Sequence, residues 1–319
     1  MKIVILDGHL TNPGDISWKP IEKIGELTVY SNTSAEERVK NIADAEAVIV
    51  NRTKLDEKIF SQCPQIKYVG LLGTGYNYIE LEAAKKRGIT VCNVPGYSTY
   101  AVAQTAISLL LHGTNKVAEY NSYIKSGRWE SEIDSNITAL SLTELYGKTI
   151  GIVGYGAIGK RVAEIAMALG MKVLAYRRNP VTKEERENLK FVNLDTLLAQ
   201  SDVVTIHCPL CDDTVGMMNK EAFAKMKDGA MFINTARGGL VDEQALSEAL
   251  SSGHLSYAGL DVLSSEPPKA DNPLLKQHNC VITPHVAWTP KQTRERLVQI
   301  VADNIAAFEV GKPQNVVNR

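Results

Sequence analysis

Residues 147–170 read GKTIGIVGYGAIGKRVAEIAMALG, and this stretch decides the fold of the chain around it. The apolar run TIGIV leads into Gly154, Gly156 and Gly159, which have GxGxxG spacing, and an amphipathic, helix-like stretch follows. The apolar run KVLAY at 172–176 completes a β–α–β unit. In that context the glycines permit a tight turn and let a pyrophosphate approach the helix N-terminus. The pattern predicts a dinucleotide-binding turn; a turn that only packs helix on strand is the alternative.

Strand-like runs alternate with helical intervals on both sides of this turn. From residue 147 onward they are KTIGIVG, MKVLAY, SDVVTIHC, GAMFINT, YAGLDVL and CVITPHV, six strands that match a doubly wound nucleotide-binding sheet. Before it they are KIVIL (2–6), LTVY (27–30), AVIV (47–50), KYVGLLG (67–73) and TVCNVP (90–95). Since strands that alternate with helices form parallel sheets, we expect an α/β protein with two doubly wound lobes.

Three predicted helices frame these lobes. One lies within 34–45 (SAEERVKNIADA), with Ser34 as its N-cap. A mostly apolar helix at 99–117 joins the two lobes, and the polar residues that interrupt it argue against a membrane span. The last helix lies within 289–311 and ends at Gly311.

The composition excludes several classes of protein. The 319 residues are 44% hydrophobic and 22% charged, which is typical of a globular chain of two domains. The net charge of −1 provides no basic face for nucleic acid and no polybasic membrane patch. The N-terminus begins a strand at once instead of a signal peptide, and the five cysteines are scattered. We therefore expect a cytoplasmic protein without a disulfide framework.

The end of the strand after the glycines bears on the cofactor. An NAD site has an Asp or Glu about 20 residues beyond the glycines, where it binds the ribose hydroxyls. Here the chain has Arg177 and Arg178, two guanidiniums that can pair with a 2′-phosphate. This substitution favours NADP over NAD. The alternative is that both arginines are solvated surface charges and NAD binds.

Arg237, Glu266 and His285 follow three later strands. Ligands bind beyond the carboxyl ends of parallel strands, so all three side chains are directed at one crevice. Reduction of a ketone needs a proton donor, and histidine is suited to this near neutral pH. A hydrogen-bonded carboxylate raises the pKa of an imidazole and fixes its tautomer, and an arginine can grip a carboxylate with two hydrogen bonds. Taken singly, each could be a surface Arg, a turn Glu or a capping His.

Cys208 and Cys211 have the CxxC spacing of redox pairs and of half a zinc site. No second CxxC and no histidine pair at ligand spacing follows. We therefore predict no metal site.

The segments NTARGGLVDEQAL, AGLDVLSSEPP and ITPHVAW resemble the signatures of the D-isomer-specific 2-hydroxyacid dehydrogenase family. The resemblance extends over nearly the whole chain, since LLGTGYNYIE, NVPGYSTYAVAQ, GKTIGIVGYGAIGKRVA and SDVVTIHCPL also look like family blocks. DGHLTNPGDISW and the terminal GKPQNVVN are similar to its glycerate dehydrogenase (hydroxypyruvate reductase) branch. It implies an oxidoreductase that transfers a hydride between NAD(P) and a small 2-keto or 2-hydroxy acid, most simply hydroxypyruvate/D-glycerate or glyoxylate/glycolate.

The resemblance also implies a domain plan and roles for individual residues. A Rossmann-type NAD(P)-binding domain at 101–287 would be inserted in a flavodoxin-like substrate (catalytic) domain formed by 1–100 and 288–319, in a homodimer. Arg237 would bind substrate, and His285, partnered by Glu266, would bind it and act as acid/base. The backbone at Gly73, Thr74 and Gly75 would hold the substrate carboxylate. The implied cofactor-binding residues are Gly154, Gly156, Ala157, Ile158, Gly159, Arg177, Arg178, His207, Cys208, Pro209, Thr214, Thr235, Ala236 and Asp261.

Two departures leave alternatives open. Arg177 replaces the ribose-binding acid common in the family, and the segment 132–142 (EIDSNITALSL) lacks the aromatic character of the glycerate branch. A reductase of a bulkier 2-keto acid is therefore one alternative. A non-catalytic NAD(H)-binding regulator on the same fold is another, although all three catalytic residues are retained.

Overall fold

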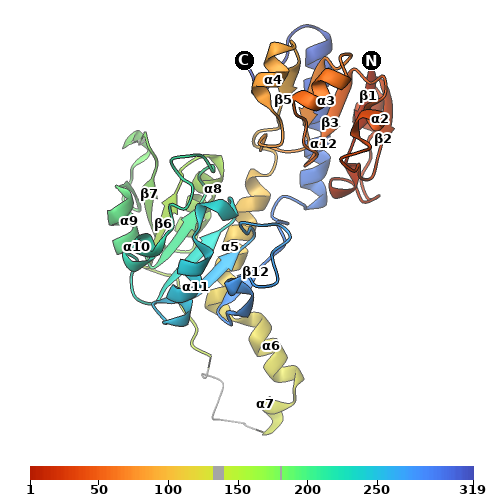
Figure 1. The fold of residues 1–319 in the computed structure, drawn as a ribbon. Helices are drawn as coiled ribbons and strands as arrows, with labels where there is room; N and C mark the ends of the chain where they lie inside the picture. Colours follow the sequence, from red (N-terminus) through yellow and green to blue (C-terminus); the bar gives the residue numbers. More distant parts are fainter. Residues whose placement is uncertain (132–139, 180–181) are drawn as a thin grey trace. The chain divides into compact units, whose positions relative to one another are not determined.

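The chain divides into two compact units in a computed structural model that describes residues 1–131, 140–179 and 182–319 (Figure 1). Unit 1 comprises Met1–Ser98 and Trp288–Arg319, and unit 2 comprises Thr99–Ala287. Each unit contains one parallel sheet, which confirms the predicted α/β class. Within the described ranges no helix has the length and apolar character needed to cross a membrane.

The sheet of unit 1 has the strand order β2-β1-β3-β4-β5, and all its pairs are parallel. This is the flavodoxin-like order. The strands are β1 (Lys2–Ile5), β2 (Glu26–Val29), β3 (Ala47–Val50), β4 (Tyr68–Leu71) and β5 (Thr90–Cys92). The helices are η1 (Gly8–Leu10), α1 (Lys19–Glu22), α2 (Arg38–Ile42), α3 (Glu57–Gln62), α4 (Leu81–Lys86) and α12 (Lys291–Glu309).

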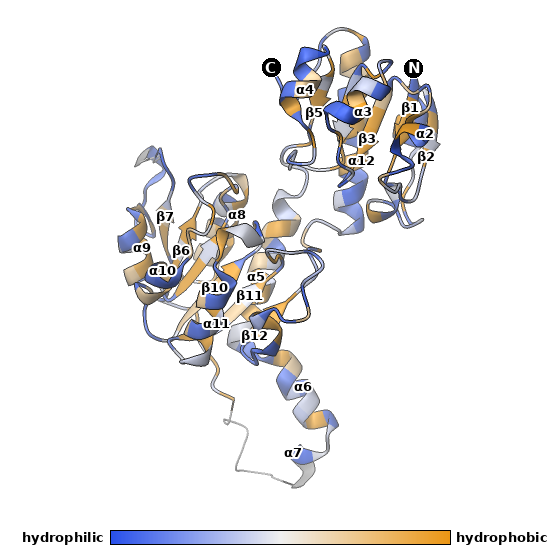
Figure 2. Ribbon diagram, viewed as in Figure 1, coloured by the Kyte–Doolittle hydropathy of each residue, from blue (hydrophilic) through white to orange (hydrophobic). Residues whose placement is uncertain are grey.

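Alternation along β1 shows how this sheet is buried on both faces. Ile3 and Ile5 belong to a core with Leu297 and other apolar residues of α12. Val4 lies on the opposite face, in a core with residues of α3 such as Phe60. Successive side chains of a strand point to opposite faces, so a continuous apolar run serves both cores. Figure 2 shows these strands as hydrophobic ribbons inside more polar helices.

The sheet of unit 2 has the order β12-β11-β10-β9-β6-β7-β8, again with every pair parallel. The strands are β6 (Thr149–Val153), β7 (Lys172–Tyr176), β8 (Leu189–Phe191), β9 (Val203–Ile206), β10 (Ala230–Asn234), β11 (Leu255–Leu260) and β12 (Cys280–Ile282). The helices are α5 (Thr99–Asn115), α6 (Val117–Lys125), α7 (Arg128–Ser131), α8 (Ala157–Ala168), η2 (Thr182–Glu184), α9 (Leu194–Gln200), α10 (Lys220–Ala224), η3 (Gly238–Leu240), α11 (Glu243–Ser251) and η4 (Pro273–Lys276).

The first six strands of this sheet follow the doubly wound order of dinucleotide-binding domains, and β12 extends it at one edge. Ile150 and Ile152 of β6 lie in a core with α5 and α8. Gly151 between them faces α9, where a Cβ atom would lie 2.4 Å from the side chain of Leu197. The order in which the strands are added changes side between β6 and β9. In doubly wound sheets ligands bind beyond the carboxyl ends of the strands at this switch point.

Two predictions about secondary structure are wrong. The sheet of unit 2 has a seventh strand, β8, which is only three residues long and pairs with β7 at the edge. So short a run has no readable periodicity. The helix predicted from Ser34 begins instead at Arg38, with Glu37 at the N-cap position and no side-chain cap.

The ends of the two long helices are set by local conformation. α5 stops at Asn115, two residues before the predicted end, because Lys116 adopts a left-handed conformation with φ 46° before α6 begins. α12 ends at Glu309 and is followed by Gly311 with φ 71°, as predicted for a glycine that terminates a helix. Residues 132–139, most of the segment 132–142, lie outside the described residues.

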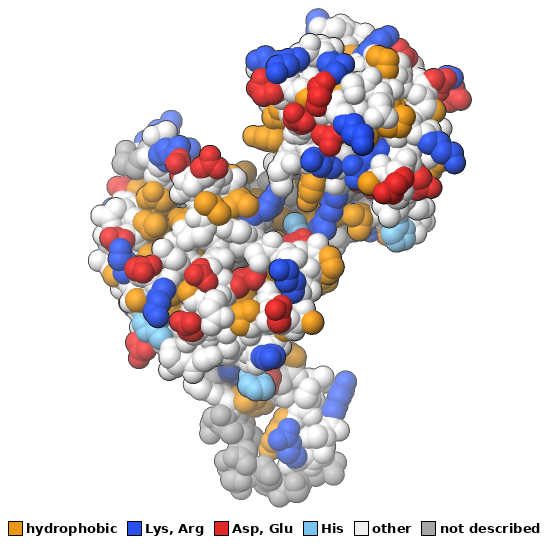
Figure 3. Space-filling model, in the orientation of Figure 1, with side chains coloured by type: hydrophobic (Ala, Val, Ile, Leu, Met, Phe, Trp, Pro, Cys, Tyr) orange, Lys and Arg blue, Asp and Glu red, His pale blue; other side chains and the backbone are white. Residues whose placement is uncertain are grey.

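Charges of both signs are mixed on the surface. On the face drawn in Figure 3, Lys and Arg alternate with Asp and Glu over both units. This agrees with the near-zero net charge of the chain.

Candidate active site

The turn between β6 and α8 needs each of its three glycines for a different reason. Gly154 has φ 102°, and a Cβ atom there would lie 2.6 Å from the backbone of His207 and of Cys208. A Cβ at Gly159 would lie 2.2 Å from the carbonyl oxygen of Gly154, so the helix packs directly on the turn. A Cβ at Gly156 would meet nothing within 4 Å, which leaves the backbone open to a ligand. These are the three roles that a dinucleotide-binding turn assigns to its glycines.

The N-terminus of α8 faces the same open position. Gly156 is its N-cap and forms no side-chain cap, and Lys160 N–H is the donor to the Gly156 carbonyl at 2.9 Å. The N–H groups of the first turn, at Ala157, Ile158 and Gly159, have no acceptor inside a helix. A phosphate beside them would receive hydrogen bonds and the favourable end of the helix dipole.

His207 follows β9, the strand that neighbours β6. Its Nε2 lies 3.0 Å from Oγ1 of Thr205, whereas its Nδ1 is enclosed and has no partner among the described residues. Burial lowers the pKa of this imidazole to about 3, so the ring is neutral at physiological pH. Oγ1 of Thr235, after β10, is a second enclosed polar atom without a partner in the described chain. Unsatisfied buried polar atoms are costly, so both fit a site completed by a bound group.

The residues present therefore fit a nicotinamide dinucleotide. The open glycine, the helix N-terminus and two enclosed polar atoms all lie at the carboxyl ends of β6, β9 and β10. No cluster of three metal-ligating side chains occurs within residues 1–131, 140–179 and 182–319.

The loop after β9 holds three further predicted cofactor residues. Thr214 closes it, because its hydroxyl donates to the carbonyl of Pro209 at 2.8 Å and accepts the N–H of Cys211 at 2.9 Å. The thiol of Cys208 lies 3.7 Å from the sulfur of Met217, and burial raises the pKa of this thiol to about 11. The hydroxyl of Thr214 thus has a structural task within its own loop. Cys208 and Cys211 are free thiols.

The two arginines after β7 differ in their surroundings. Arg178 forms an exposed ion pair with Asp213, with 2.6 Å between Nη2 and Oδ2. Arg177 is exposed and forms no ion pair with another described residue. Its guanidinium is therefore available to an anion, whereas that of Arg178 would first have to leave Asp213.

His285 and Glu266 are in direct contact. Nδ1 of the imidazole lies 2.7 Å from Oε2 of the carboxylate, and both side chains are about a quarter exposed. A carboxylate can only accept here, so Nδ1 carries the proton and the second ring nitrogen is left for other chemistry. The two residues come from the loops after neighbouring strands β12 and β11.

Asp261 holds the loop that carries His285. Its carboxylate accepts the N–H groups of Val286 and Ala287, both at 2.9 Å, and the hydroxyl of Thr283 at 2.6 Å. The side chain is buried. A carboxylate has about four lone pairs in its plane that can accept hydrogen bonds, and these three bonds occupy all but one of them. Its main task in the structure is to position this loop.

Asn234 positions the loop that carries Arg237, and sequence reasoning missed it. Its Oδ1 accepts the N–H of Ala236 at 2.9 Å, and its Nδ2 donates to the carbonyl of Arg237 at 2.9 Å. Asn234 is buried at the end of β10, where a polar residue following an apolar strand is the signal that could have identified it. The guanidinium of Arg237 donates to the carbonyl of Ala236 at 2.7 Å.

The Arg237 and Glu266 loops are packed against each other. A Cβ atom at Gly238 would lie 1.9 Å from the carbonyl carbon of Leu263, so only glycine permits this contact. The structure thus places the loops of Arg237, Glu266 and His285 together, at the carboxyl ends of the strands of unit 2.

The predicted carboxylate-binding loop belongs to unit 1. The carbonyl of Gly73 accepts the N–H of Val94 at 2.9 Å, and the hydroxyl of Thr74 donates to the carbonyl of Val94 at 2.8 Å. The carbonyl of Thr74 accepts the side chain of Asn93 at 2.8 Å. None of these bonds uses the N–H groups of Gly73, Thr74 or Gly75, so the loop is held in place by its oxygen atoms.

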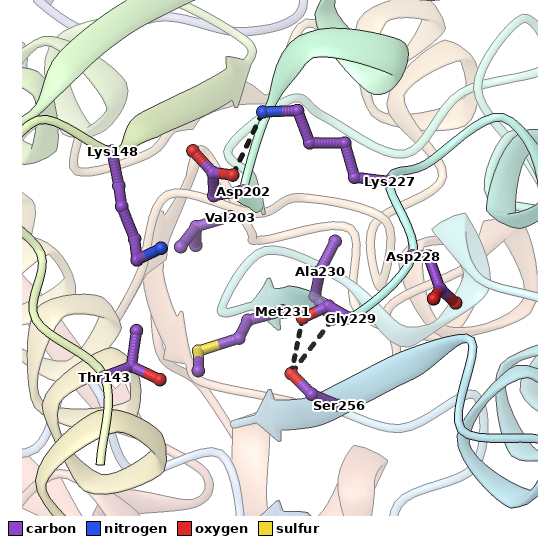
Figure 4. A pocket seen from close by; sticks show the side chains of 10 residues that line it. All are labelled: Thr143, Lys148, Asp202, Val203, Lys227, Asp228, Gly229, Ala230, Met231 and Ser256. Atoms are coloured by element: carbon purple, nitrogen blue, oxygen red, sulfur yellow. Dashed lines mark hydrogen bonds and ion pairs between the residues drawn. The ribbon is translucent and has the colours of Figure 1, made fainter. Parts of the chain in front are cut away.

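A separate cavity of about 220 Å³ opens at the amino ends of the strands of unit 2 (Figure 4). It is lined by Lys148, Lys227, Asp202 and Asp228 together with smaller residues. Lys227 is paired with Asp202 at 3.0 Å, and the four charges cancel. The glycine turn lies at the carboxyl ends of the strands and this cavity at their amino ends, so the cavity is not part of the site described above.

Comparison with known proteins identifies relatives along the whole chain. Residues 107–287 match the family described as D-isomer specific 2-hydroxyacid dehydrogenase, NAD binding domain. The sequence is 49% identical over 324 residues to a hydroxypyruvate reductase of Blautia hydrogenotrophica, with 100% of both chains covered.

Two solved structures are similar over their full length. An acyclic imino acid reductase in complex with NADPH and D-Arg has a TM-score of 0.87 at 31% identity, covering 99% of this chain and 100% of that one. A D-lactate dehydrogenase with NAD+ from Lactobacillus jensenii has a TM-score of 0.84 at 32% identity, covering 100% of both.

Proposed function

Because the chain belongs to the D-isomer specific 2-hydroxyacid dehydrogenase family, we propose that it reduces hydroxypyruvate to D-glycerate, and glyoxylate to glycolate, with a nicotinamide cofactor. As a member of this family it is an oxidoreductase that acts on the CH–OH group of its donors. The observation that carries the proposal is the 2.7 Å contact between Nδ1 of His285 and Oε2 of Glu266. The 49% identity to a hydroxypyruvate reductase supports the choice of substrate.

His285 is the acid/base in this proposal. When bound, the cofactor supplies the hydride that adds to the keto carbon. Glu266 accepts Nδ1–H and keeps the ring oriented, so the proton on Nε2 is directed to the substrate oxygen. In the opposite direction the neutral Nε2 removes the proton of the hydroxyl group.

Arg237 and the loop at Gly73–Gly75 bind the substrate in this proposal. Arg237 would exchange its bond to the Ala236 carbonyl for the carboxylate of the 2-keto acid, which it can grip with two hydrogen bonds. The N–H groups of Thr74 and Gly75, which are not used in the loop's own bonds named above, can likewise bind a carboxylate. Unit 1 would then be the substrate domain, and unit 2 the cofactor domain.

We propose NADP as the preferred cofactor. Arg177 is exposed and without an ion pair among the described residues, at the strand end where a ribose-binding acid would exclude a 2′-phosphate. Arg178 can assist if it leaves Asp213. Similar folds bind NADPH in one solved structure and NAD+ in another, so both must be compared directly.

We propose a homodimer formed through the region of α6. No residue of this helix is buried, and Val117, Ile124 and Trp129 of α6 and α7 expose large apolar side chains. Figure 1 shows α6 leading away from the sheet of unit 2. Ile124→Glu should shift the protein from dimer to monomer in analytical ultracentrifugation.

The five free cysteines are in keeping with a cytoplasmic location.

The test of the function is the oxidation of reduced cofactor in the presence of hydroxypyruvate, with NADPH and NADH compared at matched concentrations. We expect turnover with both, and a higher kcat/KM with NADPH. His285→Ala should lower kcat about a hundredfold to ten-thousandfold while the Kd of the cofactor changes little. Full activity in this variant would refute the role of His285. Turnover only with larger 2-keto acids would change the substrate, and no turnover with any 2-keto acid would refute the proposal.

A further inference from the structure

Glu243, the first residue of α11, directs its carboxylate away from its own helix. Oε1 accepts the N–H of Ser264 at 2.7 Å, and Oε2 accepts the hydroxyl of Ser264 at 2.8 Å and Nδ2 of Asn272 at 2.9 Å. All three donors belong to the segment between β11 and β12. α11 does not need this carboxylate as a cap, because Asp242 accepts the N–H of Ala245 at 3.0 Å.

The segment that Glu243 holds carries Glu266. Ser264 precedes Glu266 by two residues, and the N–H of Leu263 approaches Oε1 of Glu266 at 3.4 Å. On its other side the backbone at Leu263 is pressed against Gly238. Asn272 is buried and caps η4 by accepting the N–H of Leu274 at 3.0 Å, so the far end of the segment is fixed as well.

The carboxylate of Glu266 is tied to both His285 and its own backbone segment. Its Oε2 lies 2.7 Å from Nδ1 of His285, and the N–H of Leu263 approaches its Oε1 at 3.4 Å. A shift of the backbone at residues 263–266 would therefore move this carboxylate relative to His285. A displacement of about 1 Å at a catalytic group can lower a rate about a hundredfold.

We propose that Glu243 is a positioning residue for catalysis: by binding Ser264 and Asn272 it holds Glu266 within hydrogen-bonding distance of His285. This inference rests on the proposed function, in which the Glu266–His285 pair acts in proton transfer. In this proposal Glu243 acts through Glu266 and not by direct contact with the reacting groups.

Glu243→Gln tests the proposal, because it keeps the size of the side chain but replaces one acceptor oxygen with an NH₂ group that cannot accept from Ser264 or Asn272. We expect kcat with hydroxypyruvate to fall about tenfold or more, whereas KM and the Kd of NADPH change less than about twofold. Proton NMR supplies a second readout. The low-field resonance of the Nδ1–H of His285, assigned by its loss in His285→Asn, should shift or broaden in Glu243→Gln.

The matched control is Asp242→Ala, which removes the cap of the same helix but no bond to the Glu266 segment. It should lower Tm and leave kcat and the His285 resonance unchanged. If Asp242→Ala impairs both as much as Glu243→Gln does, or if Glu243→Gln leaves both as in the wild type, the proposal is refuted. Should Glu243→Gln fail to fold, Ser264→Ala removes only the hydroxyl donor and must show a smaller change of the same kind.

Failure of the proposed function is distinguishable from failure of this inference. If the wild type has no activity with any 2-keto acid, the function is refuted, yet the His285 resonance still reports whether Glu243 positions Glu266. If the wild type is active and the resonance does not respond to Glu243→Gln, only the positioning role is lost.

Discussion

The N–H of His285 donates to the backbone carbonyl of Asp261 at 2.8 Å. The carboxylate of the same aspartate accepts the N–H groups of Val286 and Ala287, the two residues after His285. Asp261 therefore binds this loop through both its main chain and its side chain. His285 has φ 54°, a left-handed conformation that is unfavourable for a residue with a side chain. The bonds from Asp261 offset that cost. The orientation of the imidazole is therefore determined from the end of β11, 24 residues earlier in the chain.

Asp261→Asn is expected to impair both stability and turnover. The amide keeps one acceptor oxygen, and its NH₂ group faces donors, so a buried N–H or hydroxyl group loses its partner at a cost of about 1–3 kcal/mol. The free energy of unfolding and kcat measure the two effects. Thr283→Val, which removes one donor and leaves the carboxylate, should cost less. Wild-type kcat in Asp261→Asn would contradict the positioning of His285 by this residue.

Gly156→Ala should impair cofactor binding, whereas Gly159→Ala should impair the stability of the fold. Gly156 has a conformation that alanine can adopt and open space beside it, so Gly156→Ala should leave Tm nearly unchanged and raise the Kd of the cofactor about tenfold or more. Gly159→Ala places a Cβ atom 2.2 Å from the Gly154 carbonyl oxygen and should destabilise the fold by about 1–3 kcal/mol. Equal cofactor affinity in Gly156→Ala and the wild type would show that the open position is not used.

Arg177 and Arg178 should contribute unequally to the use of NADPH. Arg177→Ser removes a guanidinium that has no ion pair among the described residues, so kcat/KM with NADPH should fall about tenfold to a hundredfold while that with NADH stays the same. Arg178→Ser should have a smaller effect because Arg178 is already paired with Asp213. Equal losses with both cofactors would mean that the arginines act on the fold and not on the 2′-phosphate.

His207 should make the folded protein less stable as the pH falls. Burial lowers the pKa of His207 from 6.5 to about 3, so between these values the unfolded chain binds a proton that the folded chain does not. Stability is then lost with decreasing pH, by at most about 1.4 kcal/mol per pH unit from this group. His207→Gln removes the titration, so its free energy of unfolding should decline less than that of the wild type between about pH 6.5 and 5. Parallel curves for the two proteins would contradict a buried neutral imidazole.

The residues to which we assign chemical roles could be predicted from the sequence because they follow strands. GKTIGIVGYGAIG predicts a β–α–β unit and therefore a parallel sheet. In a parallel sheet the carboxyl ends of all strands lie on the same side. Arg237, Glu266 and His285 stand at such ends, and family resemblance assigned their roles. The residues that hold them were not accessible in this way. Asn234 and Glu243 resemble any polar residue at the end of a strand or the start of a helix until their partners are known.

Local patterns alone also misplaced two boundaries. Ser34 precedes a helical stretch as an N-cap would, yet the helix starts at Arg38. β8 has three residues and forms because β7 offers it an open edge, which is a property of the sheet and not of LKF. Short-range propensities are worth less than the tertiary contacts that compete with them.

By itself the sequence determined the α/β class, the two parallel sheets, the dinucleotide-binding turn and the residue types of the site, because periodicity and glycine spacing are written in neighbouring residues. Only the tertiary structure decided which groups meet. The contact of His285 with Glu266 spans 19 positions, and that of Ser264 with Glu243 spans 21. Residues so far apart in the sequence come into contact only when the strands and helices pack. The packing of the whole sheet and its loops therefore determines these contacts, and no short stretch of sequence specifies them.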